Sequence, residues 1–438
     1  MKIYNNPKIM NKKTNRRNFI KTTAAAAIGM PTLIPASALG KNGAVAPSNR
    51  IVVGGIGLGP RGRNVLAGFF AHKDCQFVAI ADVQKERREI IKRLADREYG
   101  NRDCVTYDDM SGVLERDDID SVIIATGDRW HTTASITAAR AGKDIYCEKP
   151  CAMNIMECQQ LDDTIRKHKR VFQAGTQRRS VPNFKLAVDL ARSGKLGQVT
   201  SVHAGILELQ QYLEPLPAEP EPDPSDINWD KWLGPSPWMD FNAAYCRGRW
   251  RNHAGLYAAW RLPEWGSHTI DVCQWAADAD GTTPIEYEPV SDGEIVAKYS
   301  NGVKLVMRLS GFEGEGVWQE GLGTCPVRFE GDEGWVEAGD AKAIVTSNPK
   351  LIKNKKYDQI NGTDPVMHAR NFLDCVKTRE DPICNSTAVR YGHMACFAAA
   401  ISWKLGRKVT FDPKKERFIG DAEANSMRTY KRRAPYTI

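Results

Sequence analysis

Short apolar runs alternate with amphipathic stretches between Arg50 and about Ala174. Apolar residues recurring every three or four positions predict helices, and short continuous apolar runs predict strands buried on both faces. Strands that alternate with helices in this way form parallel sheets. We expect strands at Ile51–Ile56, Phe77–Ala81, Ser121–Thr126, Ile145–Cys147 and Val171–Ala174, and helices at Asn64–Phe70, Lys85–Tyr99, Thr133–Ala141 and Ile155–His168.

The pattern changes after Gln198, where strand-like stretches follow one another without helices between them. Such a succession predicts an antiparallel sheet in a second, α+β domain. Glu214–Asp226 holds five prolines in thirteen residues and is expected to be an extended loop. Helical patterns at Pro365–Thr378 and Ala388–Leu405 are expected to pack back across the molecule. The strand-like stretches are Val199–Leu209, Ile285–Glu288, Ile295–Tyr299, Val303–Leu309, Val327–Glu330 and Trp335–Ala338.

A glycine-rich turn follows the first predicted strand. Gly57, Gly59 and Gly62 are spaced as in a βαβ dinucleotide site, and Asp82 closes the next apolar run. The first glycine permits a tight turn, the second lets the backbone approach a pyrophosphate, and the third lets the helix pack on the strand. The sequence therefore predicts a Rossmann domain that binds a nicotinamide dinucleotide. The carboxylate of Asp82 favours NAD, although Lys85, Arg87 and Arg88 could accommodate NADP.

Charge separates the first 38 residues from the rest of the chain. Of the formal net charge of +8, seven units come from this segment, which has no acidic residue, so the remainder is nearly neutral and does not suit a nucleic-acid partner. Arg16-Arg17 resembles a twin-arginine export motif, an alanine-rich apolar stretch follows, and Ala36-Ser37-Ala38 has the form of a cleavage site. We expect export to the periplasm and no membrane span in the mature chain.

These patterns predict an α/β + α+β fold in which an N-terminal Rossmann parallel sheet precedes a C-terminal α/β domain with a mainly antiparallel open sheet. At 438 residues the chain is too long for one ordinary core. The expected parts are a leader over residues 1–38, the Rossmann domain over 50–174, a substrate and oligomerisation domain over 175–410, and a C-terminal extension over 411–438. The eleven cysteines lack metal-ligand or Cys-x-x-Cys spacing, so we assign neither a metal nor a disulfide framework.

Two further segments carry candidate chemistry. Glu148-Lys149-Pro150 places a lysine at the carboxyl end of a predicted strand, the edge where such sheets bind ligands, although a solvated lysine would fit the same position. Glu264, His268 and Asp271 share one face if their segment is helical. A carboxylate beside an imidazole suits a group that removes a hydroxyl proton, whereas a lone histidine is usually structural.

With these three motifs, the chain resembles the glucose–fructose oxidoreductase / inositol dehydrogenase / MocA (Gfo/Idh/MocA) family over nearly its whole mature length. The stretches Trp229–Pro237, Asn371–Val376 and Gly420–Asn425 add to the likeness, especially to exported members with twin-arginine signals. The resemblance implies NAD(P)-linked chemistry on carbohydrates and a homo-oligomer, either dimer or tetramer.

The resemblance also implies roles for individual residues. The family's catalytic lysine and histidine fall on Lys149 and His268, and its usual aspartate is replaced by Glu264, which would orient His268. In the loop Gly127–His131, which corresponds to the loop beside the nicotinamide, Trp130 and His131 would supply a stacking and polar pair. The expected cofactor contacts are Gly57, Gly59, Arg61, Gly62, Asp82, Thr126, Trp130, His131, Glu148 and Lys149, and the expected substrate contacts are Gln177, Arg178 and Asp271.

The resulting hypothesis is an oxidoreductase that moves hydride between a secondary hydroxyl of a sugar, glycoside or polyol and a tightly bound nicotinamide cofactor. One alternative is an NAD-dependent glycoside hydrolase that oxidises the sugar transiently, eliminates the glycosidic bond, adds water and reduces the sugar again. Another is a sugar-binding module that has kept the fold. Lys149 and His268 favour an enzyme over the last reading.

Overall fold

The computed structural model describes residues 45–207, 213–253, 256, 262–309, 318–341, 344–353 and 360–437. The leader predicted over residues 1–38 and its twin-arginine motif lie outside these ranges. Residues 1–49 form a separate unit, whose described part contains the short 3-10 helix η2 (Pro47–Asn49). Within the described ranges, every helix is too short or too polar to traverse a lipid bilayer.

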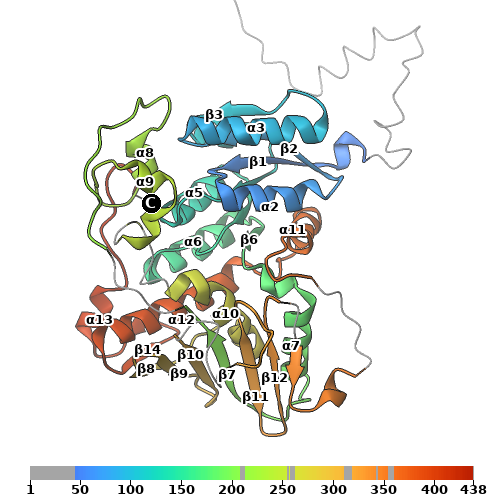
Figure 1. Ribbon diagram of the computed structural model, residues 1–438, viewed down its shortest axis with the longest axis vertical. Coiled ribbons are helices and arrows are strands. Elements are labelled where there is room, and N and C mark those ends of the chain that lie inside the picture. Colours follow the sequence, from blue (N-terminus) through green and yellow to red (C-terminus); the bar gives the residue numbers. More distant parts are fainter. Residues whose placement is uncertain are drawn as a thin grey trace, which may run out of the picture. The chain divides into compact units, whose positions relative to one another are not determined.

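The first half of the second unit is a six-stranded parallel sheet with strand order β3-β2-β1-β4-β5-β6. This order confirms the Rossmann prediction, since the strand sequence reverses between β1 and β4 and opens a crevice at their carboxyl ends. Figure 1 shows α2 and α3 beside β1 and β2. The elements are β1 (Ile51–Ile56), α2 (Pro60–Phe70), β2 (Cys75–Ala81), α3 (Lys85–Tyr99), β3 (Val105–Tyr107), α4 (Ser111–Leu114), β4 (Ser121–Ile124), α5 (Asp128–Arg140), β5 (Asp144–Cys147), α6 (Ile155–His168) and β6 (Phe172–Ala174).

The second half is built on a nine-stranded sheet with order β13-β12-β11-β7-β10-β9-β8-β14-β15. Its pairs are antiparallel except β7 with β10, in agreement with the mainly antiparallel sheet that the sequence predicts. The strands are β7 (Val199–Gly205), β8 (Glu286–Ser291), β9 (Glu294–Lys298), β10 (Lys304–Arg308), β11 (Val327–Gly331), β12 (Trp335–Ala338), β13 (Ile344–Thr346), β14 (Val409–Asp412) and β15 (Arg417–Phe418).

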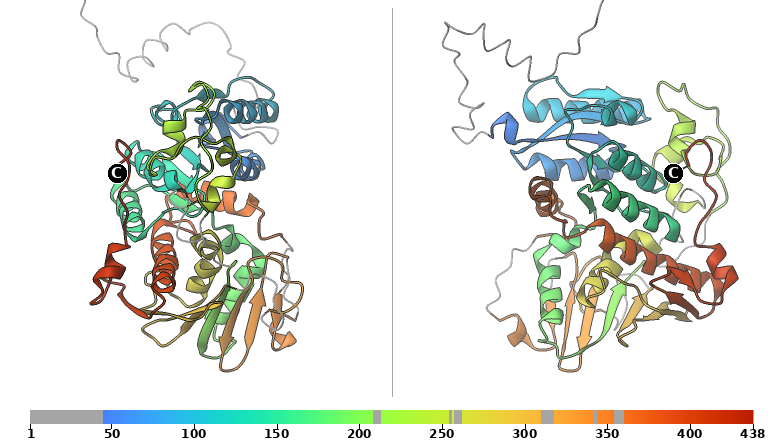
Figure 2. Two further views of the ribbon diagram at one scale, coloured as in Figure 1. Left: turned by 60° about the vertical axis from the view of Figure 1, so that its left-hand side comes forward. Right: turned by 180° about the vertical axis from the view of Figure 1, so that it is seen from behind.

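Helices cover one face of this sheet (Figures 1 and 2) and separate it from the Rossmann helices. The long helix α12 packs against both α6 and α10, while α11 packs on α2, as the pattern of the two closing helices predicts. The helices after β6 are η3 (Gln177–Ser180), α7 (Pro182–Arg192), α8 (Trp229–Leu233), α9 (Ala243–Cys246), η4 (Arg249–Asn252), α10 (Leu262–Ala276), η6 (Pro349–Leu351), α11 (Val366–Thr378), α12 (Ser386–Leu405) and α13 (Ala422–Ser426).

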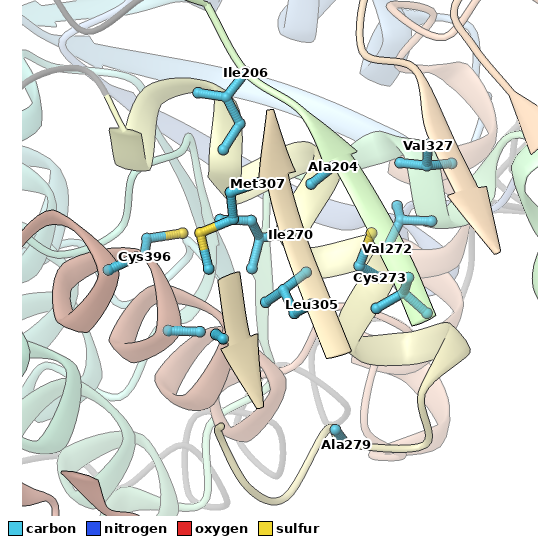
Figure 3. Packing of buried hydrophobic residues seen from close by; sticks show 14 of the residues in the cluster. Ala204, Ile206, Ile270, Val272, Cys273, Ala279, Leu305, Met307, Val327 and Cys396 are labelled. Atoms are coloured by element: carbon cyan, nitrogen blue, oxygen red, sulfur yellow. The ribbon is translucent and has the colours of Figure 1, made fainter. Parts of the chain in front are cut away.

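Helix α10 is buried between the sheet and α12. Figure 3 shows Ile270 and Cys273 of this helix among Leu305 and Met307 of β10 and Cys396 of α12. Most of its fifteen residues are buried, including the polar Ser267, His268, Thr269, Asp271 and Gln274. A buried polar group is costly unless it finds a hydrogen-bond partner. The position of α10 therefore depends on what these side chains bind.

The strongest of these contacts is the ion pair between Asp271 and Arg179. The Arg179 guanidinium, 1% exposed, donates from Nε and Nη2 to the two carboxylate oxygens of Asp271 at 2.7 and 2.8 Å. Its Nη1 donates to Asp280 at 2.7 Å. Arg179 lies in η3, shortly after β6, so this cluster fixes α10 to the start of the second domain.

Replacement of Arg179 by alanine should destabilise the protein by about 3–5 kcal/mol, because it leaves the buried carboxylate of Asp271 without its counter-ion. Urea unfolding of the variant and the wild type measures the difference. The matched control is Arg192→Ala, which removes the exposed ion pair with Asp278 and should cost less than about 1 kcal/mol. Equal losses in the two variants would contradict this role for Arg179.

Candidate active site

The glycine turn after β1 has the geometry that the sequence predicts. Gly57 has φ +67°, and a Cβ there would lie 2.3 Å from the Cγ2 of Thr126, so only glycine fits. A Cβ on Gly62 would lie 3.0 Å from the Cβ of Leu58, in keeping with close packing of α2 on β1. Helix α2 begins directly after Gly59, which provides no side-chain cap. The helix N-terminus is thus open to an anion such as a pyrophosphate.

Asp82 follows β2 and carries a carboxylate with one free oxygen. Its Oδ1 accepts from the backbone N–H of Gln84 at 2.9 Å, whereas the buried Oδ2 has no hydrogen-bond partner in the described structure. Burial raises the pKa of this carboxyl group, and Arg87 opposes that shift. A free buried acceptor at this position fits a ribose hydroxyl of NAD.

The basic residues that the sequence offers for NADP each have a partner within the protein. Arg88 donates to the backbone carbonyl of Asp82 at 2.6 Å, Arg87 donates to the carbonyl of Cys246 at 2.8 Å, and Lys85 pairs with Asp226 at 3.4 Å. A 2′-phosphate would also meet the carboxylate of Asp82. The geometry therefore favours NAD.

Two cavities adjoin the carboxyl ends of the Rossmann strands. The smaller, about 310 Å³, contains Asp82 in its wall, and the larger, about 800 Å³, contains Lys149. The two cavities share the wall residues Gln84, Arg87, Thr126, Gly127, Arg129 and Trp232. Such a pair of adjoining compartments suits a dinucleotide whose adenosine half lies beside Asp82 and whose nicotinamide half lies beside Lys149.

Lys149 follows β5 and reaches helix α10. Its Nζ donates to the backbone carbonyl of Glu264 at 2.8 Å and lies 5.7 Å from the ring centroid of Trp265. Burial lowers the pKa of this ammonium group, while Glu264 and Glu148 act in the opposite direction. The neighbouring Glu148 is buried and accepts from Arg61 Nε at 2.9 Å. The lysine thus lines the larger cavity, with its ammonium group bonded to the start of α10.

His268 stands out among the buried polar residues of α10. The carboxylate of Asp271 is paired, Ser267 bonds to the carbonyl of Pro263, and Gln274 donates to the carbonyl of Thr282 at 2.8 Å. The Nδ1 of His268 is buried without a partner in the described structure. Burial, followed by the positive charges of Arg178, Lys149 and Arg61, holds the pKa of the imidazole well below its usual value. The ring is therefore neutral near pH 7 and able to accept a proton.

Glu264 does not have the contact with His268 that was expected from their spacing. Among the described residues no hydrogen bond joins the two side chains; the Glu264 carboxylate lies 3.7 Å from Arg251 Nε. Its backbone carbonyl holds Lys149 instead. Glu264 thus contributes to the cavity wall and to the position of the lysine. In the part of the chain that the structure describes, no hydrogen bond supports the predicted orientation of His268 by this carboxylate.

The predicted substrate contacts lie differently from what was expected. Arg178 binds both carboxylate oxygens of Asp340 at 3.0 and 2.6 Å, and Asp271 is bound by Arg179. Arg178 and Asp271 are each held in a buried ion pair and do not line either cavity, and His268 is likewise not among the lining residues. Gln177, in the amide orientation that satisfies both of its groups, accepts from Arg61 at 2.7 Å and so lies behind the larger cavity.

Trp130 and His131 line different cavities of the two. The indole N–H of Trp130 donates to the carbonyl of Lys231 at 2.9 Å, and the ring lines the smaller cavity. Trp130 therefore lines the same cavity as Asp82, and its stacking on the nicotinamide stays a prediction. His131 lines the larger cavity, with Nδ1 2.7 Å from the carbonyl of Pro150 and Nε2 unpartnered in the described structure.

Sequence reasoning missed Asp128 and Arg129, although both belong to the loop that it singled out. Asp128 is 4% exposed, lines the larger cavity and has a buried Oδ2 without a partner in the described residues. Burial raises the pKa of Asp128 to about 7, with Arg251 and Lys149 opposing the shift. Burial lowers the pKa of Arg129 to about 9, and its guanidinium lies 3.9 Å from the ring centroid of Trp232. The sequence signal that could have identified both residues is their position shortly after β4, at the edge where such sheets bind ligands.

No group of three or more His, Cys, Asp or Glu side chains in the described ranges is arranged to hold a metal ion. All eleven cysteines are buried and none is in a disulfide.

Comparison with known proteins identifies the family. Residues 50–176 match the model of the oxidoreductase family with an NAD-binding Rossmann fold, and residues 199–438 match the model of the C-terminal alpha/beta domain of that family. The chain therefore belongs to the Gfo/Idh/MocA oxidoreductases, and its first domain is an NAD-binding Rossmann domain.

A glycosyl hydrolase family 109 protein from Solibacter usitatus is 27% identical over 213 residues, which are 44% of this chain and 45% of that protein. This chain thus matches less than half the length of that relative. Among solved structures, aldose-aldose oxidoreductase from Caulobacter crescentus has a TM-score of 0.57 at 18% identity, covering 83% of this chain and all of that one. Levoglucosan dehydrogenase with NADH and levoglucosan has a TM-score of 0.58 at 16% identity, covering 82% and 99%. These structures share the fold.

Replacement of Asp82 by alanine should weaken NAD binding by about 1–3 kcal/mol, because it removes the acceptor for a ribose hydroxyl. Isothermal titration of nucleotide-free protein measures this loss. The control Lys85→Ala removes an exposed ion pair and should change affinity by less than about fivefold. Unchanged NAD affinity in Asp82→Ala would refute the assignment.

Replacement of Asp128 by asparagine should give a pH-dependent gain in stability. The folded protein retains a proton on Asp128 up to about pH 7, whereas the unfolded chain releases it near the ordinary aspartate pKa of 3.8. Wild-type stability therefore falls as pH rises through this window, and the variant escapes that loss, which amounts to about 4 kcal/mol at most. Urea unfolding at a series of pH values tests this. A difference between variant and wild type that stays flat with pH, as we expect for the exposed control Asp117→Asn, would contradict it.

Proposed function

We propose that this protein is an NAD-dependent dehydrogenase that acts on a secondary hydroxyl of a sugar, glycoside or polyol. The observation that carries the proposal is His268, whose Nδ1 is buried without a partner in the described structure and whose low pKa reflects burial and the positive charges of Arg178 and Lys149. A buried imidazole nitrogen without a partner is costly. A role in proton transfer explains that cost.

When bound, NAD supplies the hydride acceptor at its nicotinamide ring. In the proposed reaction, Lys149 holds the substrate oxygen and stabilises the negative charge that develops on it. In the neutral imidazole of His268 that the low pKa favours, one ring nitrogen carries no proton; we assign that state to Nδ1, which would accept the hydroxyl proton. Glu264 holds Lys149 in place through its backbone carbonyl.

Carbohydrate as the substrate class is supported by two kinds of observation. The larger cavity offers charged and polar side chains, including Arg61, Asp128, Lys149, Arg251 and Glu264, to a ligand with several hydroxyl groups. Two solved structures with the same fold are those of an aldose-aldose oxidoreductase and a levoglucosan dehydrogenase. The fold alone does not fix the substrate, so the assignment rests on the site.

A second candidate is an NAD-dependent glycoside hydrolase, favoured by the similarity to glycosyl hydrolase family 109 proteins. In this reaction, removal of hydride from a sugar carbon acidifies the neighbouring C–H bond. Loss of that proton expels the glycosidic oxygen, water adds to the resulting double bond, and return of the hydride restores the alcohol. The same lysine and histidine would serve the oxidation and the reduction.

Single substitutions Lys149→Ala and His268→Ala should each lower turnover about 10²–10⁴-fold, the usual contribution of acid–base groups, without loss of NAD binding. Turnover is followed as NADH formed from a panel of sugars and polyols. The control is the exposed Lys195→Ala, which should react like the wild type. Turnover close to that of the wild type in either variant would remove that residue from the proposed mechanism.

The same preparations separate the two candidate reactions. A dehydrogenase accumulates NADH and an oxidised sugar in equal amounts and releases no nitrophenol from nitrophenyl glycosides. Steady release of nitrophenol from NAD-loaded enzyme, without net NADH, would reject the dehydrogenase in favour of the hydrolase.

A further inference from the structure

The end of the chain reaches the nucleotide cavity. After α13 the last residues run back to the Rossmann domain, and the right-hand view of Figure 2 shows the chain end beside α8. Pro435, Tyr436 and Thr437 line the smaller cavity together with Asp82. One wall of the adenosine compartment is therefore made by the last described residues, here called the C-terminal tail (428–437).

Side-chain contacts fasten this tail to helix α8. The hydroxyl of Tyr436 donates to Oδ2 of Asp230 at 2.5 Å, and Arg433 donates from Nη2 to the backbone carbonyl of Asp230 at 2.8 Å. Burial, together with the negative charge of Asp230, raises the pKa of Tyr436 to about 12. The ring of Tyr436 packs edge-on against Trp130, with centroids 5.2 Å apart. Tyr436 thus joins the tail, α8 and α5 at the cavity.

Helix α8 is itself fastened to the loops of the cavity. The backbone N–H of Asn228 donates to the carbonyl of Val83 at 3.2 Å, beside Asp82, and Lys231 forms an ion pair with Asp109 at 2.8 Å. Lys231 and Trp232 also line the smaller cavity. The tail therefore packs on a helix that itself lines the smaller cavity.

We propose that the C-terminal tail is a component of the NAD site that slows release of the nucleotide, with the Tyr436–Asp230 contact as its fastening. Its occupant is the adenosine half of NAD, because the tail lines the compartment that holds the free acceptor of Asp82. The proposal rests on NAD binding and does not depend on the sugar chemistry. The tail would slow the release of NAD from a cavity that lies at the edge of the sheet.

The test is the rate at which NAD leaves the holoenzyme. Enzyme loaded with labelled NAD is mixed with excess unlabelled NAD, without sugar, and the label that remains on the protein is followed with time. Tyr436→Phe keeps the ring but removes the hydroxyl, and Asp230→Asn removes the charge that accepts from it. Each should speed release by roughly tenfold, the effect of losing a hydrogen bond to a charged group. A chain that ends at Arg432 should release NAD faster still.

The matched control is Lys431→Ala, an exposed position in the same tail, which should release NAD like the wild type. If the shortened chain does not fold, the two point variants decide the matter. Release within about twofold of wild type in both Tyr436→Phe and Asp230→Asn would overturn the proposal. Since no sugar is present, this result is independent of whether the protein proves to be a dehydrogenase or a hydrolase.

Discussion

The buried ion pair between Arg179 and Asp271 is the contact on which the reaction centre depends. Arg179 follows the last Rossmann strand, and Asp271 lies in the middle of α10, so the pair fixes this helix to the start of the second domain. The same helix brings His268 and the carbonyl of Glu264 to the edge of the Rossmann sheet, where that carbonyl holds Lys149. A shift of α10 that broke the contact of Asp271 with Arg179 would also move the carbonyl of Glu264 away from Lys149.

Burial sets the charge state of this centre. It lowers the pKa of Lys149 and His268 and raises that of Asp128 to about 7, so each group is pushed toward its neutral form. The buried Glu148 offsets part of the effect on the lysine. Of these groups, Asp128 has the pKa closest to neutral pH, and strongly shifted pKa values of this kind are common at functional sites.

Local patterns in the sequence predicted the parts of the molecule that local physics determines. The glycine turn, Asp82 and the helices α3 and α6 follow from periodicity and backbone sterics, and the structure places them as expected. Partners distant in sequence could not be found in this way. The spacing of Glu264, His268 and Asp271 on one helix face was predicted, but not that Arg179 binds Asp271, which depends on how α10 packs. The same holds for Trp130, whose indole is captured by the carbonyl of Lys231.

The nucleotide compartment shows why distant segments matter for function. Asp82 lies on a local βαβ motif, but part of the wall of the cavity that contains it comes from α8 and the C-terminal tail. Burial raises the cost of an unpaired carboxylate oxygen, and it strengthens in the same measure the hydrogen bond that a ribose hydroxyl would make there. A cavity that begins at a motif common to many dinucleotide sites is thus completed by segments that lie far from it in the sequence.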